Sequence, residues 1–353
     1  MKRSSLPEYR SYEIAYDNVG NIDQVTDWLR LANGDTLTWD TDYTHDASHR
    51  LTQSDMTRKL FDYSASSTTT DSVKTNTYAY DTFNNLKELT DPANDTYYYA
   101  HDDAHQLLRI CKNDSTCLST SQNIDTANTF DLNGNQLTRT RGSEVLSMSY
   151  DELDRMTQAS INGGTETFKY DYQDRRIEKN DGTDTYYYHQ HGLQVAGEYK
   201  NSWTSTPAQH AYGPYDIDMP IARSKNGTVD YFHQDYRNSV VMQTSANGDL
   251  NGWKQFGDWG DVSEEGGNYP PMFGFAGREH DDSGLIHMRA RNYDPSQQRF
   301  TQRDPLGFID GINRYTYVMN SPVLYIDPMG TNTNTGNTGA GNDTDNKQKG
   351  EFL

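Results

Sequence analysis

Three Asp-Pro pairs stand close together near the end of the chain, and aspartates at this spacing can do chemistry. The pairs are Asp294-Pro295, Asp304-Pro305 and Asp327-Pro328. Two aspartates held near one peptide bond share a proton, because two close carboxylates cannot both ionise cheaply. The ionised carboxylate takes a proton from water, and the neutral one donates to the carbonyl of the bond that is cut. Proline also restricts the residue before it, so each pair is equally a sharp turn between short strands.

An aspartate that follows an aromatic residue or a histidine recurs along residues 1 to 200. The copies begin at Asp17, Asp46, Asp81, Asp102, Asp131, Asp151 and Asp171. The third position after each aspartate tolerates the left-handed backbone region, and it holds Gly20, His49, Asn84, His105, Gly134, Asp154 and Asp174. The pattern therefore predicts a turn with positive φ in each copy and a β-hairpin around it. We interpret His49 and His105 as turn residues for this reason.

The composition fits such hairpins. Apolar residues make up 33% of the 353 residues, while 26 Tyr, 11 Phe and 5 Trp are too many aromatic residues for a disordered chain. We expect an all-β fold in which stacked hairpins pair edge to edge into one long sheet that curls and spirals. A rolled sheet with one wet face tolerates so low an apolar fraction, whereas a compact two-layer core does not.

The net charge of -20 excludes some classes of partner. Phosphate groups attract basic surfaces, so binding to nucleic acid or to anionic membranes is not expected. The sequence has no run of about 20 apolar residues that would span a membrane. Its start, MKRSSLPEYR, turns polar at once and lacks the pattern of a signal peptide.

Candidate metal sites in the sequence are incomplete. Residues 131–135 resemble the start of a calcium loop, but its twelfth position is Gly142 and not glutamate. His189 and His191 share one face of a predicted strand, and no third ligand is close in sequence. We expect no metal and no cofactor.

Cys111 and Cys117 are the two cysteines of the chain. In an oxidising compartment they can close a small loop at a hairpin tip. Their spacing, without a CxxC partner, is a weak metal signal. Free thiols are our expectation for a chain made in the cytosol.

The segment between residues 283 and 330 contains RARNYDP, RFTQRDPLG, DGINRYTYVMNSP and YIDPMG in that order. This ordered set resembles the conserved core that closes Rhs and YD-repeat proteins, and the upstream aspartate pattern is similar to the YD repeats of Rhs proteins, teneurins and Tc-toxin C subunits. The resemblance continues through residues 201–282, where Asn238 and Val240 replace the Gly and Pro of the family motif. It implies a hollow β shell closed by a C-terminal plug.

The resemblance divides the chain into four parts. Residues 1–200 would form the YD-repeat hairpin shell, and residues 201–282 further shell strands and a loop. Residues 283–330 would form the plug, and residues 331–353 a disordered polar tail. Five aromatic residues near the end of the second part are expected to anchor and seal the shell: Trp253, Phe256, Trp259, Phe273 and Phe275. The chain is too short to enclose a sizeable guest alone.

The resemblance also implies a site. The RDPLG and DPMG motifs carry the aspartyl autoprotease of the family, which makes Asp304 and Asp327 the carboxylate pair. Arg303 would hold or bias one carboxylate, and Asp310 is a second-tier candidate. The family cuts after D-P-x-G-Leu. The cut here would fall between Thr331 and Asn332, where the polar Thr331 replaces the leucine that fits a pocket.

The implied function is a structural shell that encapsulates or presents a C-terminal toxin and cleaves itself once. Expected partners are the severed effector fragment and a delivery machine or companion shell subunit. The protein would be bacterial, made in the cytoplasm, and exported by a specialised secretion system or toxin complex. The polar tail is too short to be a toxin domain. An adhesion or carbohydrate-binding module is the alternative, with the Tyr-rich segments 97–99 and 186–188 meeting glycans or serving only as cross-strand partners.

Overall fold

The computed structural model describes residues 10–117, 123–214, 217–268, 272–309 and 311–331, together with two short backbone strands at 334–335 and 347–351. Within these ranges the fold is all-β, as predicted. Every element is a strand except two single-turn 3-10 helices, η1 (Phe275–Gly277) and η2 (Val318–Asn320). None of the helices in the described part of the chain is long and apolar enough to cross a membrane.

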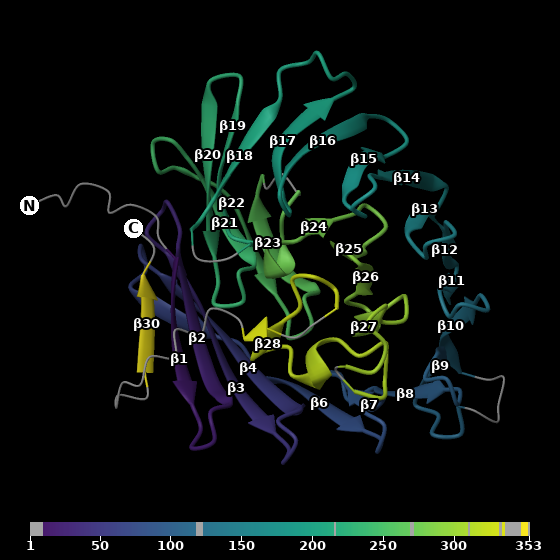
Figure 1. Cartoon of the computed structure of the whole chain (residues 1–353). Coiled ribbons are helices and arrows are strands. Elements are labelled where there is room, and N and C mark those ends of the chain that lie inside the picture. The colour runs from purple at the N-terminus through teal and green to yellow at the C-terminus, as the bar shows by residue number, and fades with distance from the viewer. Residues whose placement is uncertain are drawn as a thin grey trace, which may run out of the picture.

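One large antiparallel sheet follows the order of the chain. Its strands are β1 (Arg10–Tyr16), β2 (Ile22–Arg30), β3 (Thr36–His45), β4 (Leu51–Asp62), β5 (Ser67–Thr70), β6 (Lys74–Tyr80), β7 (Leu86–Thr90), β8 (Thr96–His101), β9 (Leu107–Lys112), β10 (Ile124–Phe130), β11 (Gln136–Arg141), β12 (Glu144–Tyr150), β13 (Met156–Ile161), β14 (Gly164–Tyr170), β15 (Arg176–Asn180), β16 (Thr185–His191), β17 (Gln194–Lys200), β18 (Ala208–Tyr212), β19 (Pro220–Lys225), β20 (Thr228–Gln234), β21 (Val240–Ser245), β22 (Leu250–Phe256) and β23 (Val262–Gly267). Each of these strands pairs with the one before it, except that β6 pairs with β4 beside β5. The sheet continues past residue 200 and curls around the later part of the chain (Figure 1).

The two ends of the curled sheet overlap face to face. Arg10 on β1 binds Asp27 on β2 and also donates to the carbonyls of Val241 and Lys254, at 2.9 and 2.8 Å. The rings of Trp39 and Trp253 lie 5.6 Å apart, between β3 and β22. Side-chain packing and ion pairs, rather than a ladder of backbone hydrogen bonds, hold this overlap.

The predicted turns have the predicted backbone. The third position after each repeat aspartate has positive φ in all seven copies, from 61° at Asp154 and Asp174 to 91° at Gly20. The aspartate itself holds the turn: Asp151 Oδ1 accepts from the backbone N–H groups of Leu153 and Arg155, at 2.9 and 3.0 Å. The backbone strain is therefore offset locally, within five residues.

Neighbouring turns are linked by the residue that follows the left-handed position. Arg155 binds Oδ2 of its own aspartate, Asp151, at 2.7 Å, and reaches Asp174 of the next turn at 2.8 Å. His49 likewise contacts Asn21 of the preceding turn at 2.6 Å. The histidines of the turn slot thus act in turn-to-turn contacts, as their interpretation as turn residues requires.

The plug fills the inside of the curl (Figure 1). The strands of the plug are β25 (Ile286–Met288), β26 (Arg291–Asp294), β27 (Arg299–Phe300) and β28 (Tyr325–Ile326). β24 (Glu279–His280), just before the plug, pairs with β25, and β29 (Asn334–Thr335), in the predicted tail, pairs with β28. Tyr293 and Tyr317 pack with ring centroids 4.4 Å apart in a core that includes shell residues such as Ile14 and Leu51. The five predicted aromatic anchors are all buried.

Side chains of the plug bind the row of turns. In five successive repeat turns, the carbonyl of the left-handed residue accepts a hydrogen bond from one plug side chain. The pairs are His49 with Ser321 at 2.6 Å, Asn84 with Asn320 at 2.9 Å, His105 with Arg299 at 2.5 Å, Gly134 with Tyr315 at 2.7 Å and Asp154 with Gln302 at 3.4 Å. A left-handed residue turns its carbonyl out of the strand ladder. The turn row therefore sets the position of the plug as well as the ends of the strands.

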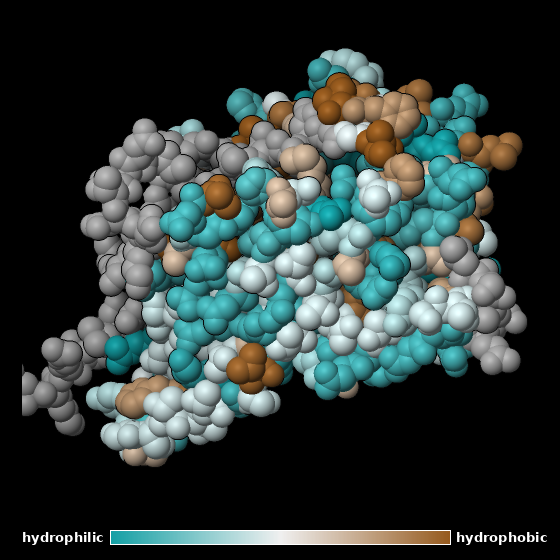
Figure 2. All heavy atoms as spheres, turned by 90° about the horizontal axis from the view of Figure 1, so that it is seen from below, coloured by the Kyte–Doolittle hydropathy of each residue, from teal (hydrophilic) through white to brown (hydrophobic). Residues whose placement is uncertain are grey.

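The polar outer face agrees with the low apolar content. Seen from below, the surface is mainly hydrophilic, with small separate hydrophobic areas (Figure 2). Along β2, buried positions alternate with partly exposed ones from Val25 to Arg30. One face of the sheet is wet, as expected for a rolled single sheet.

The expectation of free thiols is wrong. Cys111 and Cys117 form a disulfide with their Cα atoms 5.5 Å apart, at the end of β9. The loop after β9 brings both Cα atoms into the range that a disulfide needs. Among the described residues no cluster of His, Cys, Asp and Glu has the geometry of a metal site. Of the predicted tail, the structure describes Thr331, β29 and β30 (Lys347–Glu351), and β30 pairs with β1.

Replacement of Gly134 tests the docking of the plug on the turn row. Gly134 and Gly20 share the turn slot, with φ of 90° and 91°, but only at Gly134 would a Cβ overlap the plug atoms Arg303 Nε and Tyr315 Oη. We expect Gly20→Ala to lower the free energy of unfolding by about 1 kcal/mol through backbone strain. Gly134→Ala should cost about 1 to 3 kcal/mol more because the plug must shift. Urea denaturation measures both, and equal losses would contradict this docking.

Candidate functional site

A single guanidinium joins the two predicted aspartates. Arg291 opens β26, Asp304 lies in the turn after β27, and Asp327 directly follows β28. Arg291 Nη2 lies 3.0 Å from Asp304 Oδ2 and 3.2 Å from Asp327 Oδ2. All three side chains are buried. The fold therefore brings together two carboxylates that are 23 positions apart in the sequence.

Both aspartates are turn residues as well. Asp304 Oδ1 accepts from Leu306 N at 2.8 Å, and Asp327 Oδ1 accepts from Thr331 N at 3.0 Å. The glycines at the third position, Gly307 and Gly330, have positive φ. These two turns have the same hydrogen bonds and left-handed third residue as the turns of the shell repeats, with one difference. In the shell the second carboxylate oxygen binds a side chain of its own turn, whereas here it binds Arg291.

The loop that contains the predicted cleavage site wraps around the corner between β25 and β26. Arg291 Nε donates to the carbonyl of Gly330, and Ala290 N donates to Met329 O at 3.2 Å. A Cβ on Gly330 would overlap the carbonyl of Met288. The amide of Thr331 is thereby fixed on Asp327, one residue before the predicted cut. Asn332 lies outside the described residues.

The electrostatics of the site differ from those of a proton-sharing pair. An arginine cation between two carboxylates favours the ionised form of both, whereas a shared proton requires one neutral acid. A cavity of about 20 Å³ borders both aspartates and Arg314, with room for one water. The site can present an ionised carboxylate as a base to that water. Arg291 can stabilise negative charge that develops on a nearby oxygen.

Tyr317 lies beside this site. Burial raises the pKa of the Tyr317 hydroxyl, and the negative charge of Asp327 raises it further. The hydroxyl is buried without a hydrogen-bond partner. The Tyr317 hydroxyl therefore stays protonated.

Arg303 occupies a different position from the one predicted for it. Its guanidinium packs on the turn at Gly134 and bonds with Tyr315, so it belongs to the contact between plug and shell. The arginine that holds the carboxylates is Arg291, which the sequence analysis missed. Its signal was the RARNYDP motif, whose second arginine it is. Asp310 lies outside the described residues.

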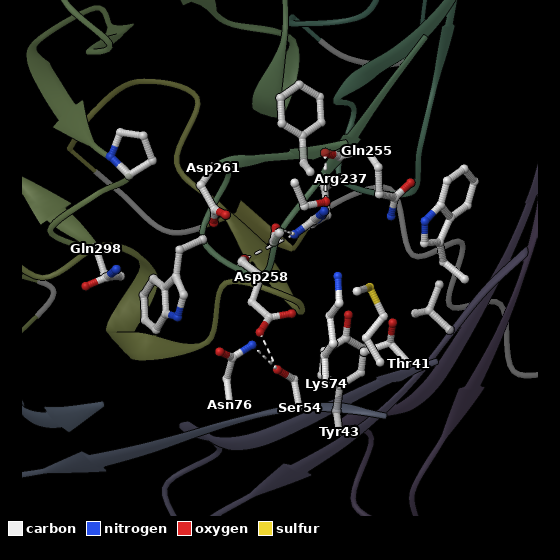
Figure 3. Close-up of a pocket in the computed structure, with 18 of the residues that line it drawn as sticks. Thr41, Tyr43, Ser54, Lys74, Asn76, Arg237, Gln255, Asp258, Asp261 and Gln298 are labelled. Carbon is white, nitrogen blue, oxygen red and sulfur yellow. Dashed lines mark hydrogen bonds between the residues drawn. The ribbon is translucent and has the colours of Figure 1, made fainter. Parts of the chain in front are cut away.

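A chamber of about 460 Å³ lies inside the curl between the first strands of the sheet and residues 235–263, and Pro295, Ser296 and Gln298 of the plug border it (Figure 3). Asp258 reaches across it and accepts from Ser54 Oγ at 2.5 Å and Tyr78 Oη at 2.8 Å, so the loop before β23 is tied to β4 and β6. Lys74 points into the open space beside these residues (Figure 3). Its lining combines aromatic side chains with a larger number of polar and charged ones.

A curled sheet of aspartate-turn hairpins with a plug that carries paired Asp-Pro turns defines a YD-repeat shell. The chain belongs to the teneurin YD-shell family, whose profile matches residues 7–325. It is 26% identical over 269 residues to the tRNA3(Ser)-specific nuclease WapA of Bacillus spizizenii, covering 72% of this chain and 11% of that protein. It is 28% identical over 239 residues to the double-stranded DNA deaminase toxin A of Burkholderia cenocepacia, covering 57% of this chain and 16% of that protein.

A solved structure shares the fold. The crystal structure named TcdB2-TccC3-Cdc42 superposes with a TM-score of 0.65 at 19% identity, over 90% of this chain and 17% of that one. The chain thus spans between a tenth and a fifth of the length of these relatives.

Replacement of Arg291 tests whether the guanidinium holds the two carboxylates. Arg291→Met leaves two buried carboxylates without their shared cation, and we expect it to lower the free energy of unfolding by about 3 to 5 kcal/mol. Adding Asp327→Asn to this variant should recover part of the loss. Arg141→Met is the control, because its ion pair with Asp125 lies at the surface and should contribute less than about 1 kcal/mol. Urea denaturation at pH 7 compares them, and a loss no larger than that of the control would refute the bridging role.

Proposed function

We propose that this chain forms the wall and the plug of a YD-repeat shell that encapsulates or presents a C-terminal toxin. The observation that supports this most is the position of the Asp327–Thr331 loop. It leaves the plug beside paired carboxylates, at the point where an attached effector would begin. Two relatives are a tRNA nuclease and a DNA deaminase toxin by name. The protein would be made in a bacterial cytoplasm and exported by a specialised secretion system or toxin complex.

The volume of the chamber limits which guests this chain could enclose alone. A folded domain of 100 residues has a radius of gyration of about 13 Å, and a sphere of that radius encloses about 9,000 Å³. The chamber of about 460 Å³ is far smaller. A folded guest therefore needs further wall, from a companion shell subunit or from additional repeats of a longer chain. Without them, the plug would present the guest rather than enclose it.

Self-cleavage would use the Arg291 site. Water attacks the carbonyl carbon of Thr331 and gives a proton to one aspartate, which leaves a tetrahedral oxyanion. Arg291 stabilises that charge. The proton then passes to the nitrogen of Asn332, the C–N bond breaks, and the products are a new carboxylate on Thr331 and a new amine on Asn332. A polar Thr331 in place of leucine would make the reaction slow.

Intact-mass spectrometry of the purified chain tests this reaction. We expect a fragment that ends at Thr331 to accumulate over days at 25 °C and to be absent in Asp304→Asn and Asp327→Asn. Asp294→Asn is the matched control, because Asp294 is also a buried Asp-Pro aspartate but binds Arg139 instead. An unchanged mass in the wild type at all times, or cleavage that survives both substitutions, would remove the protease from the proposal and leave the shell.

A cluster of aromatic residues favours a second candidate, the adhesion or carbohydrate-binding module. Tyr186 and Tyr188 face inward, so Tyr187 lies on the opposite face of β16. The half-exposed Trp203 packs against Tyr187 and Tyr199 in a tilted arrangement, with ring centroids 5.1 and 5.2 Å apart. Flat aromatic faces of this kind pack against sugar rings.

A glycan array separates the two candidates. If the chain is an adhesion module, it binds a defined glycan without any guest protein, and Trp203→Ala abolishes that binding. Trp253→Ala would be a poor control because Trp253 is buried, so Tyr172→Ala, which alters another exposed aromatic residue, serves instead. We expect no glycan signal above background for a toxin shell.

A further inference from the structure

A pocket of about 240 Å³ lies between the shell and the start of the plug. Successive strands contribute its walls: Lys179 on β15, Tyr188 on β16, Glu198 on β17, Arg223 on β19, Phe232 on β20 and Glu279 on β24. Side chains of the shell and of the segment that leads into the plug therefore meet across it.

The lining of this pocket carries an excess of negative charge. Five carboxylates line it, and only Lys179 and Arg223 oppose them. Lys179 is already bound to Glu166 at 2.8 Å and to Asp281 at 3.3 Å. The strongest cation nearby, Arg176, is taken by Asp281 in a two-point contact at 2.7 and 2.9 Å. Of the remaining carboxylates, Glu198 pairs with Arg223, and Glu279 lies near Nη1 of Arg176.

Two of these carboxylates are buried without adequate partners. Glu279 is 6% exposed, its Oε2 makes no hydrogen bond, and Arg176 Nη1 is 3.7 Å away. Glu198 is 7% exposed, and its ion pair with Arg223 spans 3.6 Å. Burial raises the pKa of Glu198, the charges of Arg223, Lys225 and Lys179 lower it, the charge of Glu279 raises it again, and the net shift is upward. Uncompensated buried charge is costly, so the pocket favours a group that brings a positive charge.

The walls define the kind of cation. Tyr188 and Phe232 are buried aromatic residues, and the pocket is also bordered by Tyr186. Aromatic faces attract ammonium and guanidinium groups and pack against an alkyl stem. A metal ion is a poorer fit, because the described residues contain no cluster suited to one. We propose that this pocket binds an alkylammonium or alkylguanidinium group between Glu198 and Glu279. The group belongs either to a free small cation or to a lysine or arginine side chain of a polypeptide inside the shell.

Calorimetric titration of the full chain tests the site. The probes are n-butylguanidinium and n-butylammonium chloride, with neutral pentanamide and equimolar NaCl as controls. We expect saturable binding of a cation and none of pentanamide. Glu279→Gln and Glu198→Gln should each weaken the affinity at least tenfold. Glu178→Gln on β15 should leave it unchanged, because Glu178 pairs with the exposed Lys169 outside this pocket.

Thermal unfolding provides the second measurement and shows that the variants fold. The melting temperature of the wild type should rise with butylguanidinium, and that of Glu279→Gln should not. Absence of saturable binding in the wild type, or equal affinity in Glu279→Gln, overturns the proposal. Blocked Ala-Arg-Ala distinguishes the sources. If it binds with the same dependence on Glu279, the pocket accepts a side chain of a polypeptide, and if only the free cations bind, it accepts a small molecule.

Discussion

The structure depends on one local interaction, an aspartate carboxylate that accepts two backbone N–H groups across a turn with a left-handed third residue. At Asp171, for example, Oδ1 accepts from the amides of Gln173 and Arg175, at 2.8 and 3.0 Å. Such a turn ends one strand, begins the next, and leaves the carbonyl of its left-handed residue free of the ladder. Repetition of the turn produces a row of carbonyls that are not used in the strand ladder, and side chains of the plug bind that row. A feature that forms within five residues thus determines the placement of a segment more than 100 residues later.

The same turn also forms the site of paired carboxylates. Asp304 and Asp327 keep the turn bond with one oxygen and give the other to Arg291. A cation that serves two carboxylates allows both to be buried, which two isolated aspartates would not be. The turn holds the loop up to Thr331 in place, and the guanidinium brings the second carboxylate close to it. The turn and the carboxylate pair are therefore two roles of the same residues.

Ion pairs join plug and shell in addition to the apolar core that they share. Arg139 binds Asp294 at 2.5 Å, and Arg176 binds Asp281 just before the plug. All four side chains are buried, although the chain has a net charge of -20. The acidic residues in excess of the basic ones lie on the solvent-exposed face, whereas these arginines lie inside. Buried pairs gain little net stability, but breaking one leaves an unpaired charge. The ion pairs therefore disfavour any other register of the plug. In the pocket at Glu198 and Glu279, the buried negative charge is only partly compensated by cations.

The sequence by itself determined the hairpin repeat, the all-β class and the seven left-handed turn positions, because a backbone conformation that Gly, Asn, Asp and His tolerate better than other residues is a local property. It also identified Asp304 and Asp327 as a pair, through motifs shared with a family. Only the tertiary structure decided that Arg291, and not Arg303, holds them, and that the cysteines are bonded. The contact of Arg10 with Val241 likewise joins residues far apart in the chain. The contact of Arg291 with the two aspartates depends on how three separate segments of the plug pack. The contact of Arg10 with Val241 depends on how far the sheet curls, and that curl is the sum of small twists over many strands that no short motif encodes.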